Sequence, residues 1–228
     1  MEAIILAGGF GTRLREVVPD VPKPMAPIAG RPFLEILLTS LSSKGFTHAI
    51  LALGYKSDVI IRHLGNHFAN MALDYVVEEQ ALGTGGAVRL ALEKATQDHV
   101  FVFNGDTYLN LEADKVEQDW LHAPYPKIVG CKVPDTARYG RLIVEDNRVV
   151  GFSEKGASGA GLINAGCYVL PRHELDTFEL GQAFSLETNY LAMNVASKRF
   201  DLFTTQGKFI DIGVPEDYAR AQTELLNL

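Results

Sequence analysis

The chain has little basic charge and no long apolar run. Its 228 residues include 21 Lys and Arg against 28 Asp and Glu, which gives a formal net charge of −7. A protein that binds nucleic acid along its surface needs clustered cations to neutralise the phosphates, so this balance argues against nucleic acid as a partner. No segment reaches the ~20 consecutive apolar residues that a membrane-spanning helix needs, which argues against a membrane partner.

Cysteine is also scarce, with Cys131 and Cys167 as the two in the chain. Each lies in an apolar, strand-like run, so two buried free thiols fit better than a disulfide, and their spacing offers no metal site. The first residues, MEAIILAGG, lack the basic start and long apolar core of a signal peptide and instead predict a strand. We therefore expect a cytoplasmic protein.

Short apolar runs alternate with helical patterns through the first half of the chain. Strands with continuous apolar character, separated by helices, indicate a mainly parallel α/β sheet that is covered on both faces, as in Rossmann-like folds. The apolar runs predict strands at 3–7, 48–53, 73–78 and 99–106, and the helical patterns predict helices at 32–45, 57–68 and 85–96.

The second half has more closely spaced strand candidates. KIVGCKVP, RLIVED, RVVGFSEK and LINAGCYVLP predict mixed strands, with a hairpin turn at EDNR, and we expect them over the ligand-binding edge of the sheet. The later patterns predict a helix at 185–197, a strand at 200–205 and a closing helix at 215–226. No linker separates the two halves, which favours a single domain that spans residues 1–228.

A cluster of glycines follows the first strand, in LAGGFGTRL (6–14). It has neither the Gly-Lys-Ser/Thr of a Walker loop nor the spacing of a dinucleotide-binding loop. Glycines at such a place let backbone N–H groups approach an anion closely, and Arg13 can add bidentate phosphate contacts. The cluster therefore indicates either a phosphate cradle or a tight structural turn.

Lys23 lies ten residues after Arg13, between two prolines in VPKPMAP (21–27). The prolines restrict the backbone, so the lysine is held as a fixed point charge. On its own it would be read as an exposed lysine in a proline-rich loop. Together with Arg13 it indicates two cations that meet one triphosphate.

Two apolar strands end in aspartate, at Asp106 in FVFNGDT (101–107) and at Asp211 in FIDIGVPEDY (209–218). Open α/β sheets bind ligands at the carboxyl ends of their parallel strands. Mg²⁺ prefers oxygen ligands and is usually held by one or two carboxylates together with substrate phosphates, so the two aspartates predict one metal site. The alternative is an Asp-turn with no ligand.

A second glycine cluster, in EEQALGTGGAV (78–88), opens a predicted helix. Its glycines indicate either close approach to a base or sugar, or only a glycine-rich start of the helix. Gln80 and Glu79 lie beside it, where they could bind the edge of a base.

Taken together, these stretches resemble the sugar-1-phosphate nucleotidyltransferases, also called nucleoside-diphosphate-sugar pyrophosphorylases. The pair GG-x-GTRL and PKPM-x-P is highly specific to that family, and the matching stretches come in the family's order from residue 3 to about 221. They are LAGGFGTRL, VPKPMAPIAGRPFLE, EEQALGTGGAV, FNGDT, FSEK, INAGCYV and FIDIGVPEDYARA.

The resemblance implies that the enzyme converts an NTP and a sugar 1-phosphate into an NDP-sugar and pyrophosphate. It implies the nucleotide-diphospho-sugar transferase fold, with a nucleotide-binding part at about 1–110 and a sugar-binding part at about 111–228. Mg²⁺ would be the cofactor, bound by Asp106 and Asp211, and small molecules would be the partners. Whether the chain forms a homodimer stays open.

The resemblance also implies the site residues. Arg13, Lys23 and Asp106 would be catalytic. The nucleotide would contact Leu6, Ala7, Gly8, Gly9, Gly11, Thr12, Arg13, Lys23, Gln80, Gly85 and Asn104. The sugar phosphate would contact Gly86, Gly140, Glu154, Lys155 and Asn164.

Within the family, the likeness is strongest to the small guanylyltransferases that act on D-glycero-α-D-manno-heptose 1-phosphate and make GDP-heptose for surface polysaccharides. Where that branch often has Glu-Pro before LGTGGA, this chain has Gln80 and Ala81. Guanine presents N–H donors that suit a carboxylate, whereas an amide also fits uracil or thymine. Three alternatives therefore stay open: a mannose-1-phosphate guanylyltransferase, a uridylyltransferase for a sugar 1-phosphate such as that of N-acetylmuramic acid, and a non-catalytic sugar-nucleotide sensor.

Overall fold

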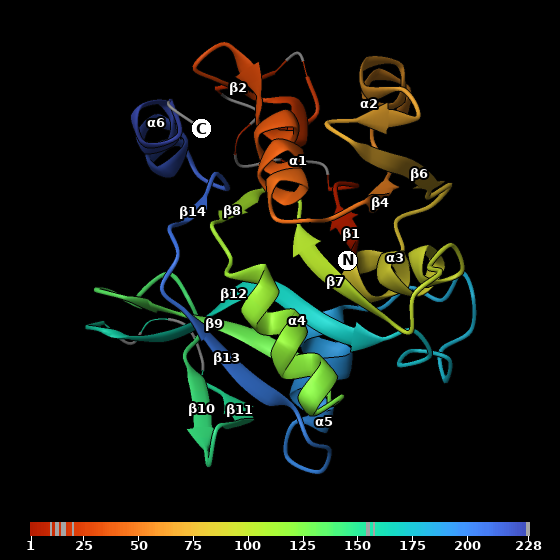
Figure 1. Ribbon diagram of the computed structural model, residues 1–228. Coiled ribbons are helices and arrows are strands. Elements are labelled where there is room, and N and C mark those ends of the chain that lie inside the picture. Colours follow the sequence, from red (N-terminus) through yellow and green to blue (C-terminus); the bar gives the residue numbers. More distant parts are fainter. Residues whose placement is uncertain are drawn as a thin grey trace.

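A ten-stranded mixed sheet runs through the molecule (Figure 1). The computed structural model describes residues 1–9, 11, 14, 17–19, 21–153, 156 and 158–226. From one edge to the other, the strands are β10 (Leu142–Glu145), β11 (Arg148–Phe152), β13 (Asp201–Thr205), β9 (Lys127–Val133), β12 (Gly161–Pro171), β7 (His99–Asn104), β1 (Glu2–Leu6), β4 (His48–Leu53), β6 (Met71–Val77) and β5 (His67–Phe68).

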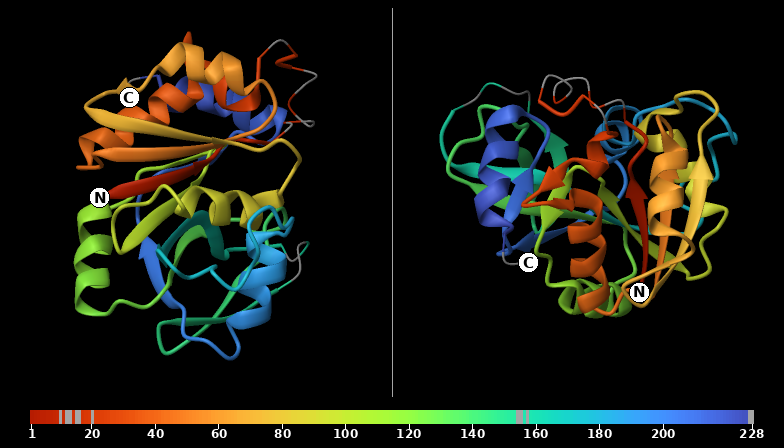
Figure 2. Two further views of the ribbon diagram at one scale, coloured as in Figure 1. Left: turned by 90° about the vertical axis from the view of Figure 1, so that its right-hand side faces the viewer. Right: turned by 90° about the horizontal axis from the view of Figure 1, so that it is seen from above.

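The first half of the chain forms the parallel part of the sheet, as predicted. Strands β7, β1, β4 and β6 pair in parallel. They are mostly apolar because both faces are covered: α1 (Phe33–Ser43), α2 (Ser57–Leu64) and α4 (Ala113–His122) pack on one face, and α3 (Gly83–Leu92) packs on the other (Figure 2). The neighbours Ile4 and Ile5 are both fully buried, one in each of the two cores.

The mixed strands of the second half, β9 to β13, continue the same sheet rather than covering its ligand-binding edge, which corrects that expectation. Strand β12 pairs antiparallel with β7 and with β9, while β13 pairs parallel with β9. Strand β12 thus lies beside β7, and β9, β13, β11 and β10 follow in that order toward the edge of the sheet. The predicted hairpin is confirmed: β10 and β11 pair antiparallel, and Asp146 and Asn147 between them have positive φ angles of 45° and 60°.

A smaller layer closes one end of the molecule. Two short ladders, β2 (Pro27–Ile28) with β3 (Arg31–Pro32) and β8 (Thr107–Leu109) with β14 (Phe209–Asp211), pack with α6 (Pro215–Glu224) around a third apolar cluster. Pro215 opens α6, as predicted. The predicted helix at 185–197 is instead a π-helix, η2 (Leu186–Leu191), followed by the short α5 (Ala192–Asn194). The sequence patterns also missed α4, which carries many charged residues.

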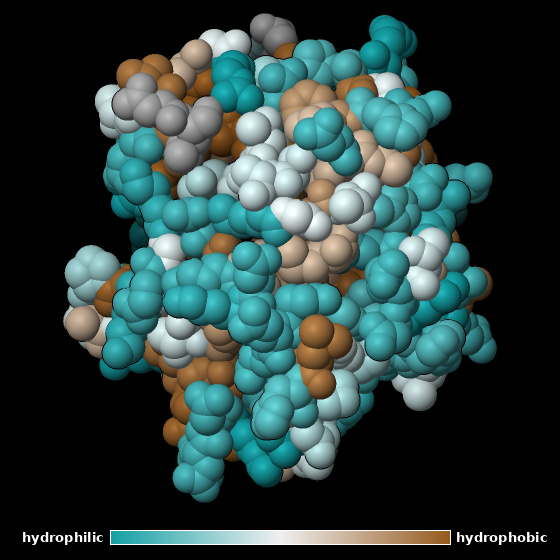
Figure 3. Space-filling model, viewed as in Figure 1, coloured by the Kyte–Doolittle hydropathy of each residue, from teal (hydrophilic) through white to brown (hydrophobic). Residues whose placement is uncertain are grey.

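The surface seen in Figure 3 is largely hydrophilic, with apolar side chains near β10, where Ile143 is exposed. Within the described part of the chain, no helix combines the length and apolar character needed to cross a membrane. Cys131 and Cys167 are buried and have free thiols, as expected.

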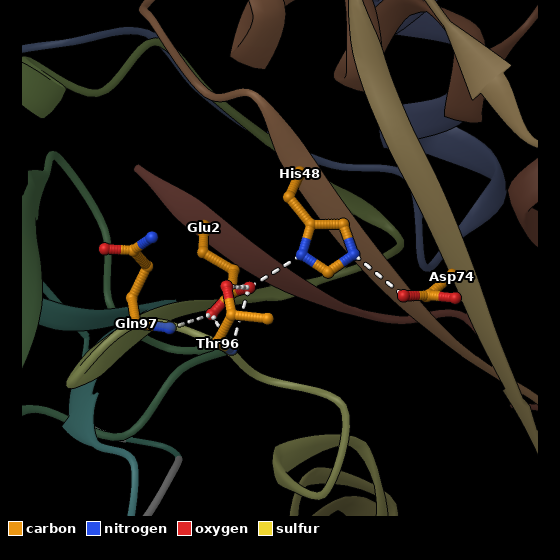
Figure 4. Close-up of polar contacts among 5 residues, drawn as sticks. All are labelled: Glu2, His48, Asp74, Thr96 and Gln97. Atoms are coloured by element: carbon orange, nitrogen blue, oxygen red, sulfur yellow. Dashed lines mark hydrogen bonds and ion pairs between the residues drawn. The ribbon is translucent and has the colours of Figure 1, made fainter.

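A buried carboxylate ties together the elements at the end of the sheet opposite the carboxyl ends of the parallel strands. Glu2 accepts hydrogen bonds from the N–H groups of Thr96 and Gln97, from the Thr96 hydroxyl, and from His48 at 2.6 Å (Figure 4). His48 also contacts Asp74 at 3.0 Å. Burial raises the pKa of Glu2, but these hydrogen bonds outweigh it, so the pKa lies below its ordinary value.

We expect Glu2→Gln to lower the free energy of unfolding at neutral pH by about 1–3 kcal/mol, because an amide replaces a buried charged acceptor. A lowered carboxyl pKa stabilises the fold above the unfolded-state pKa, and this contribution is lost as the pH falls through the folded-state pKa. Urea unfolding should therefore show the variant and the wild type converging below about pH 4. Asp74→Asn, at the more exposed end of the same chain of contacts, should cost less. If Glu2→Gln lowered the free energy of unfolding equally at neutral pH and below about pH 4, this role of Glu2 would be contradicted.

Candidate functional site

A cavity of about 290 Å³ lies at the carboxyl ends of β1 and β7. The structure brings seven of the residues singled out from the sequence into its wall, namely Leu6, Ala7, Gly8, Gly9, Lys23, Asn104 and Asp106. The rest of the wall is formed by Pro24, Glu78, Ala81, Gly83, Thr84, Ala87 and Gly105. Segments that are far apart in the sequence therefore form one concave site at the edge where open α/β sheets bind ligands.

The glycines after β1 have different structural reasons. A side chain on Gly8 would lie 2.9 Å from Glu78 Oε1, and one on Gly11 would lie 2.8 Å from Lys23 Cβ. Gly11 also has a φ of 59°, which disfavours other residues. No described residue lies within 4 Å of the corresponding position on Gly9. Gly8 and Gly11 thus allow close packing, whereas Gly9 keeps open the space in front of the backbone.

Lys23 is fixed at the wall of the cavity. It begins a short 3₁₀-helix, η1 (Lys23–Met25), with prolines on either side, and its side chain is 11% exposed. Its ammonium group donates a hydrogen bond to Asp106 Oδ2 at 2.5 Å. The cation and the carboxylate expected to act on the triphosphate are thus direct neighbours.

Asp211 lies beside this ion pair. The β8–β14 ladder pairs Asp211 with Thr107, and the N–H of Ile212 donates to the carbonyl oxygen of Asp106 at 2.9 Å. Burial raises the pKa of Asp211, and the negative charge of Asp106 raises it further, against the lowering effects of the Gly213 N–H and of Lys23. Two carboxylates that repel each other in a half-buried place form a site that a cation would stabilise.

Asn164 lies beyond the wall of this cavity and acts on it through the backbone. Its Oδ1 accepts a hydrogen bond from the Gly166 N–H at 3.0 Å, and its Nδ2 donates to the Tyr168 hydroxyl at 2.8 Å. Gly166, with a φ of 66°, leaves the space in which the Asn104 amide packs, since a Cβ there would lie 2.5 Å from Asn104 Nδ2. Gly140 is also outside the wall and packs against the Ser153 carbonyl oxygen.

Gly85 and Gly86, in the first turn of α3, pack against protein rather than facing the cavity. The N–H groups of Gly85 and Gly86 both donate to the carbonyl oxygen of Phe184, at 2.9 and 3.3 Å. A Cβ on Gly85 would lie 2.2 Å from the Phe184 ring, and one on Gly86 would lie 2.5 Å from the Gln182 carbonyl oxygen. This packing explains why these two positions are glycine. Gly83 and Thr84 form the cavity wall instead.

Glu78 lines the cavity, although the sequence reasoning passed over it in favour of Gln80. Gln80 is exposed and lies outside the wall, whereas Glu78 is half-buried and accepts a hydrogen bond from the Leu82 N–H at 2.7 Å. Burial raises the pKa of Glu78. The position of Glu78 in the sequence could have indicated it, because Glu78 directly follows the parallel strand β6. Asp106 was singled out for its similar position, just after β7.

Four of the residues implied by the family resemblance, Thr12, Arg13, Glu154 and Lys155, lie outside the described residues. Their roles stay predictions from the motifs that contain them. The metal, nucleotide and sugar contacts assigned to the described residues likewise stay predictions.

Comparison with known proteins identifies the class that this fold and site define. The chain belongs to the Nucleotidyl transferase family, which it matches over residues 2–227, and the family-level resemblance is thereby confirmed. It is 39% identical to a D-glycero-α-D-manno-heptose 1-phosphate guanylyltransferase of Aneurinibacillus thermoaerophilus, over 99% of this chain and 98% of that protein. The protein of the same name from Campylobacter jejuni is also 39% identical, over 96% and 97% of the two chains.

A solved structure shows the same fold over nearly the whole length. HddC from Yersinia pseudotuberculosis, complexed with GMP-PN, superposes with a TM-score of 0.87 at 39% identity and covers 97% of both chains. The expected Rossmann-like, mainly parallel sheet with flanking helices is therefore confirmed.

Gly85→Ala should lower the free energy of unfolding by about 1–3 kcal/mol, because the added methyl group overlaps the Phe184 ring. Gly9→Ala is the matched control. Its methyl group would enter open space and should change the stability by less than about 0.5 kcal/mol. Urea unfolding of both variants measures the difference. Equal stabilities would mean that Gly85 is kept for a ligand and not for packing.

Proposed function

We propose that this chain transfers GMP from GTP to D-glycero-α-D-manno-heptose 1-phosphate, giving GDP-heptose and pyrophosphate. The observation that carries the proposal is the pairing of Lys23 with Asp106 beside Asp211, next to a glycine-rich strand end. Two guanylyltransferases for this sugar phosphate, and HddC, whose structure contains GMP-PN, are each 39% identical over nearly the full length. These similarities support guanine as the base and the heptose as the sugar.

In the proposed reaction, a phosphate oxygen of the sugar 1-phosphate attacks the α-phosphorus of GTP, and the bond to the β-phosphate oxygen breaks as pyrophosphate leaves. Such a reaction needs the reactants to be positioned and the developing charge to be stabilised. Lys23 lines the cavity and would neutralise part of the triphosphate charge. The backbone at Gly8, Gly9 and Gly11 would approach the nucleotide, and Arg13 would hold the β- and γ-phosphates.

Asp106 and Asp211 fit a divalent cation, which we propose to be Mg²⁺. Among the described residues, no group of three or more His, Cys, Asp or Glu side chains could hold a metal, so a site here would use these two carboxylates. That number suits Mg²⁺, which usually completes its coordination with substrate phosphates and water. The cation would supply positive charge to the reacting phosphates.

The sugar 1-phosphate would be bound by residues from the second half of the chain. Lys155 would contact its phosphate, and Glu154, Asn164 and the backbone of Gly140 would contact its hydroxyl groups, as the family resemblance implies. The hydrogen bonds described above use one of the two amide hydrogens of Asn164 and one of the two lone pairs of its Oδ1. The amide can therefore still bind a hydroxyl.

Glu78 supports guanine as the base. Guanine presents the N1–H and N2–H₂ groups as adjacent donors, and a carboxylate accepts hydrogen bonds from both. Glu78 places a carboxylate in the wall near Leu6, Ala7 and Gly8, where the base is expected. Glu78, rather than Gln80, would therefore bind the base.

The proposal is tested by measuring pyrophosphate release from four NTPs against a panel of sugar 1-phosphates. We expect the highest kcat/KM with GTP and the heptose 1-phosphate, and dependence on Mg²⁺. Asp106→Asn should abolish this turnover and leave the fold intact. Activity with UTP but not GTP would refute the guanylyltransferase proposal, and binding of a GDP-sugar without any pyrophosphate release would indicate a sensor.

Glu78→Gln should raise the KM for GTP by about tenfold or more, since it removes a charged acceptor from the base. It should raise the KM for ITP less, because the hypoxanthine base lacks the N2 amino group and needs one acceptor fewer. The preference for GTP over ITP should therefore shrink. Gln80→Ala provides the comparison: if that variant loses the preference and Glu78→Gln keeps it, Gln80 reads the base.

A further inference from the structure

The segment 182–187 is docked onto the start of α3 by backbone contacts. The Phe184 N–H donates to the Leu82 carbonyl oxygen at 2.9 Å, and the Phe184 carbonyl oxygen accepts from Gly85 and Gly86. The Leu186 N–H donates to the Thr84 hydroxyl oxygen at 2.9 Å. This docking brings the Glu187 side chain to the back of the cavity wall.

Glu187 is the centre of a chain of hydrogen bonds at that place. Its Oε2 accepts from the Thr84 hydroxyl at 2.7 Å and from the Ser185 hydroxyl at 3.1 Å. Its Oε1 accepts from the Tyr168 hydroxyl at 3.4 Å. One carboxylate therefore joins α3, which lines the cavity and on the proposed function forms its nucleotide side, to β12.

Tyr168 carries the chain onward to the sugar side. It is fully buried, and burial raises its pKa well above the ordinary value, so the hydroxyl stays protonated and donates to Glu187. The same hydroxyl accepts from Asn164 Nδ2, and Asn164 Oδ1 holds the Gly166 N–H.

The hydrogen bonds thus connect Thr84, in the cavity wall, to Asn164, which is expected to contact the sugar phosphate. The register of β12 against β9 shifts between Asn164 and Tyr168, and the pairing of β12 with β7 begins at Cys167. The hydrogen bonds of Asn164 hold the short stretch between these two pairings.

We propose that Glu187 is a positioning residue that holds the nucleotide side and the sugar side of the site in one arrangement, with Tyr168 as its link to Asn164. The proposal rests on the proposed function for the identity of the two substrates. It assigns Glu187 an effect on both substrates and Tyr168 an effect on the sugar phosphate alone. Neither side chain is among the residues that line the cavity.

Three variants test this assignment through the separate KM values for GTP and for the sugar 1-phosphate. Tyr168→Phe keeps the ring and removes the link, so the KM for the sugar phosphate should rise about fivefold while that for GTP changes less than about twofold. Glu187→Gln should raise both KM values. Tyr190→Phe is the matched control, because it removes a buried tyrosine hydroxyl that donates to Glu174 and takes no part in the hydrogen bonds of Glu187. It should change neither KM value.

A merely structural role would make Tyr168→Phe and Tyr190→Phe alike, with equal losses of stability in urea and no separation of the two KM values. That result, or an equal rise of both KM values in Tyr168→Phe, would overturn the proposal. Failure of the proposed function is distinguishable, because it shows first in the wild type as a preference for another pair of substrates. The three variants are then compared with that pair, and the same separation is expected.

Discussion

The parallel pairing of β1 with β7 is the constraint on which the site depends. Leu6 lies opposite Asn104 in the register, and the Gly105 N–H donates to the Leu6 carbonyl oxygen at 2.9 Å. The glycine-rich segment and Asp106 therefore leave the sheet side by side. A shift of the register would move Asp106 away from Lys23, and the ion pair in the cavity wall would not form.

The charges of the site are arranged around that pairing by elements from three parts of the chain. The prolines beside Lys23 hold its ammonium group, and the short β8–β14 ladder brings Asp211 to the same place. Family membership and this arrangement together support nucleotidyl transfer, in which the protein acts mainly by positioning reactants and balancing phosphate charge.

Glycine shows how far sequence patterns can be taken. The clusters at 8–11 and 83–86 look alike as sequence, yet Gly9 faces open space while Gly85 packs against Phe184. The difference depends on a segment about a hundred residues further along the chain, which no local pattern contains. Gln80 and Glu78 differ in the same way, because strand ends predict a ligand-binding edge but do not say which nearby side chain turns into the cavity.

The sequence by itself determined the alternation of strands and helices, the parallel half of the sheet, and the family, because apolar periodicity and local motifs reflect burial and backbone conformation directly. It also singled out Lys23, Asp106 and Asp211 as candidate site residues. The tertiary structure decided which of these residues meet, that β12 extends the sheet beside β7, and that Glu187 joins α3 to β12. Those features depend on contacts between distant segments, which form only when the whole sheet is assembled.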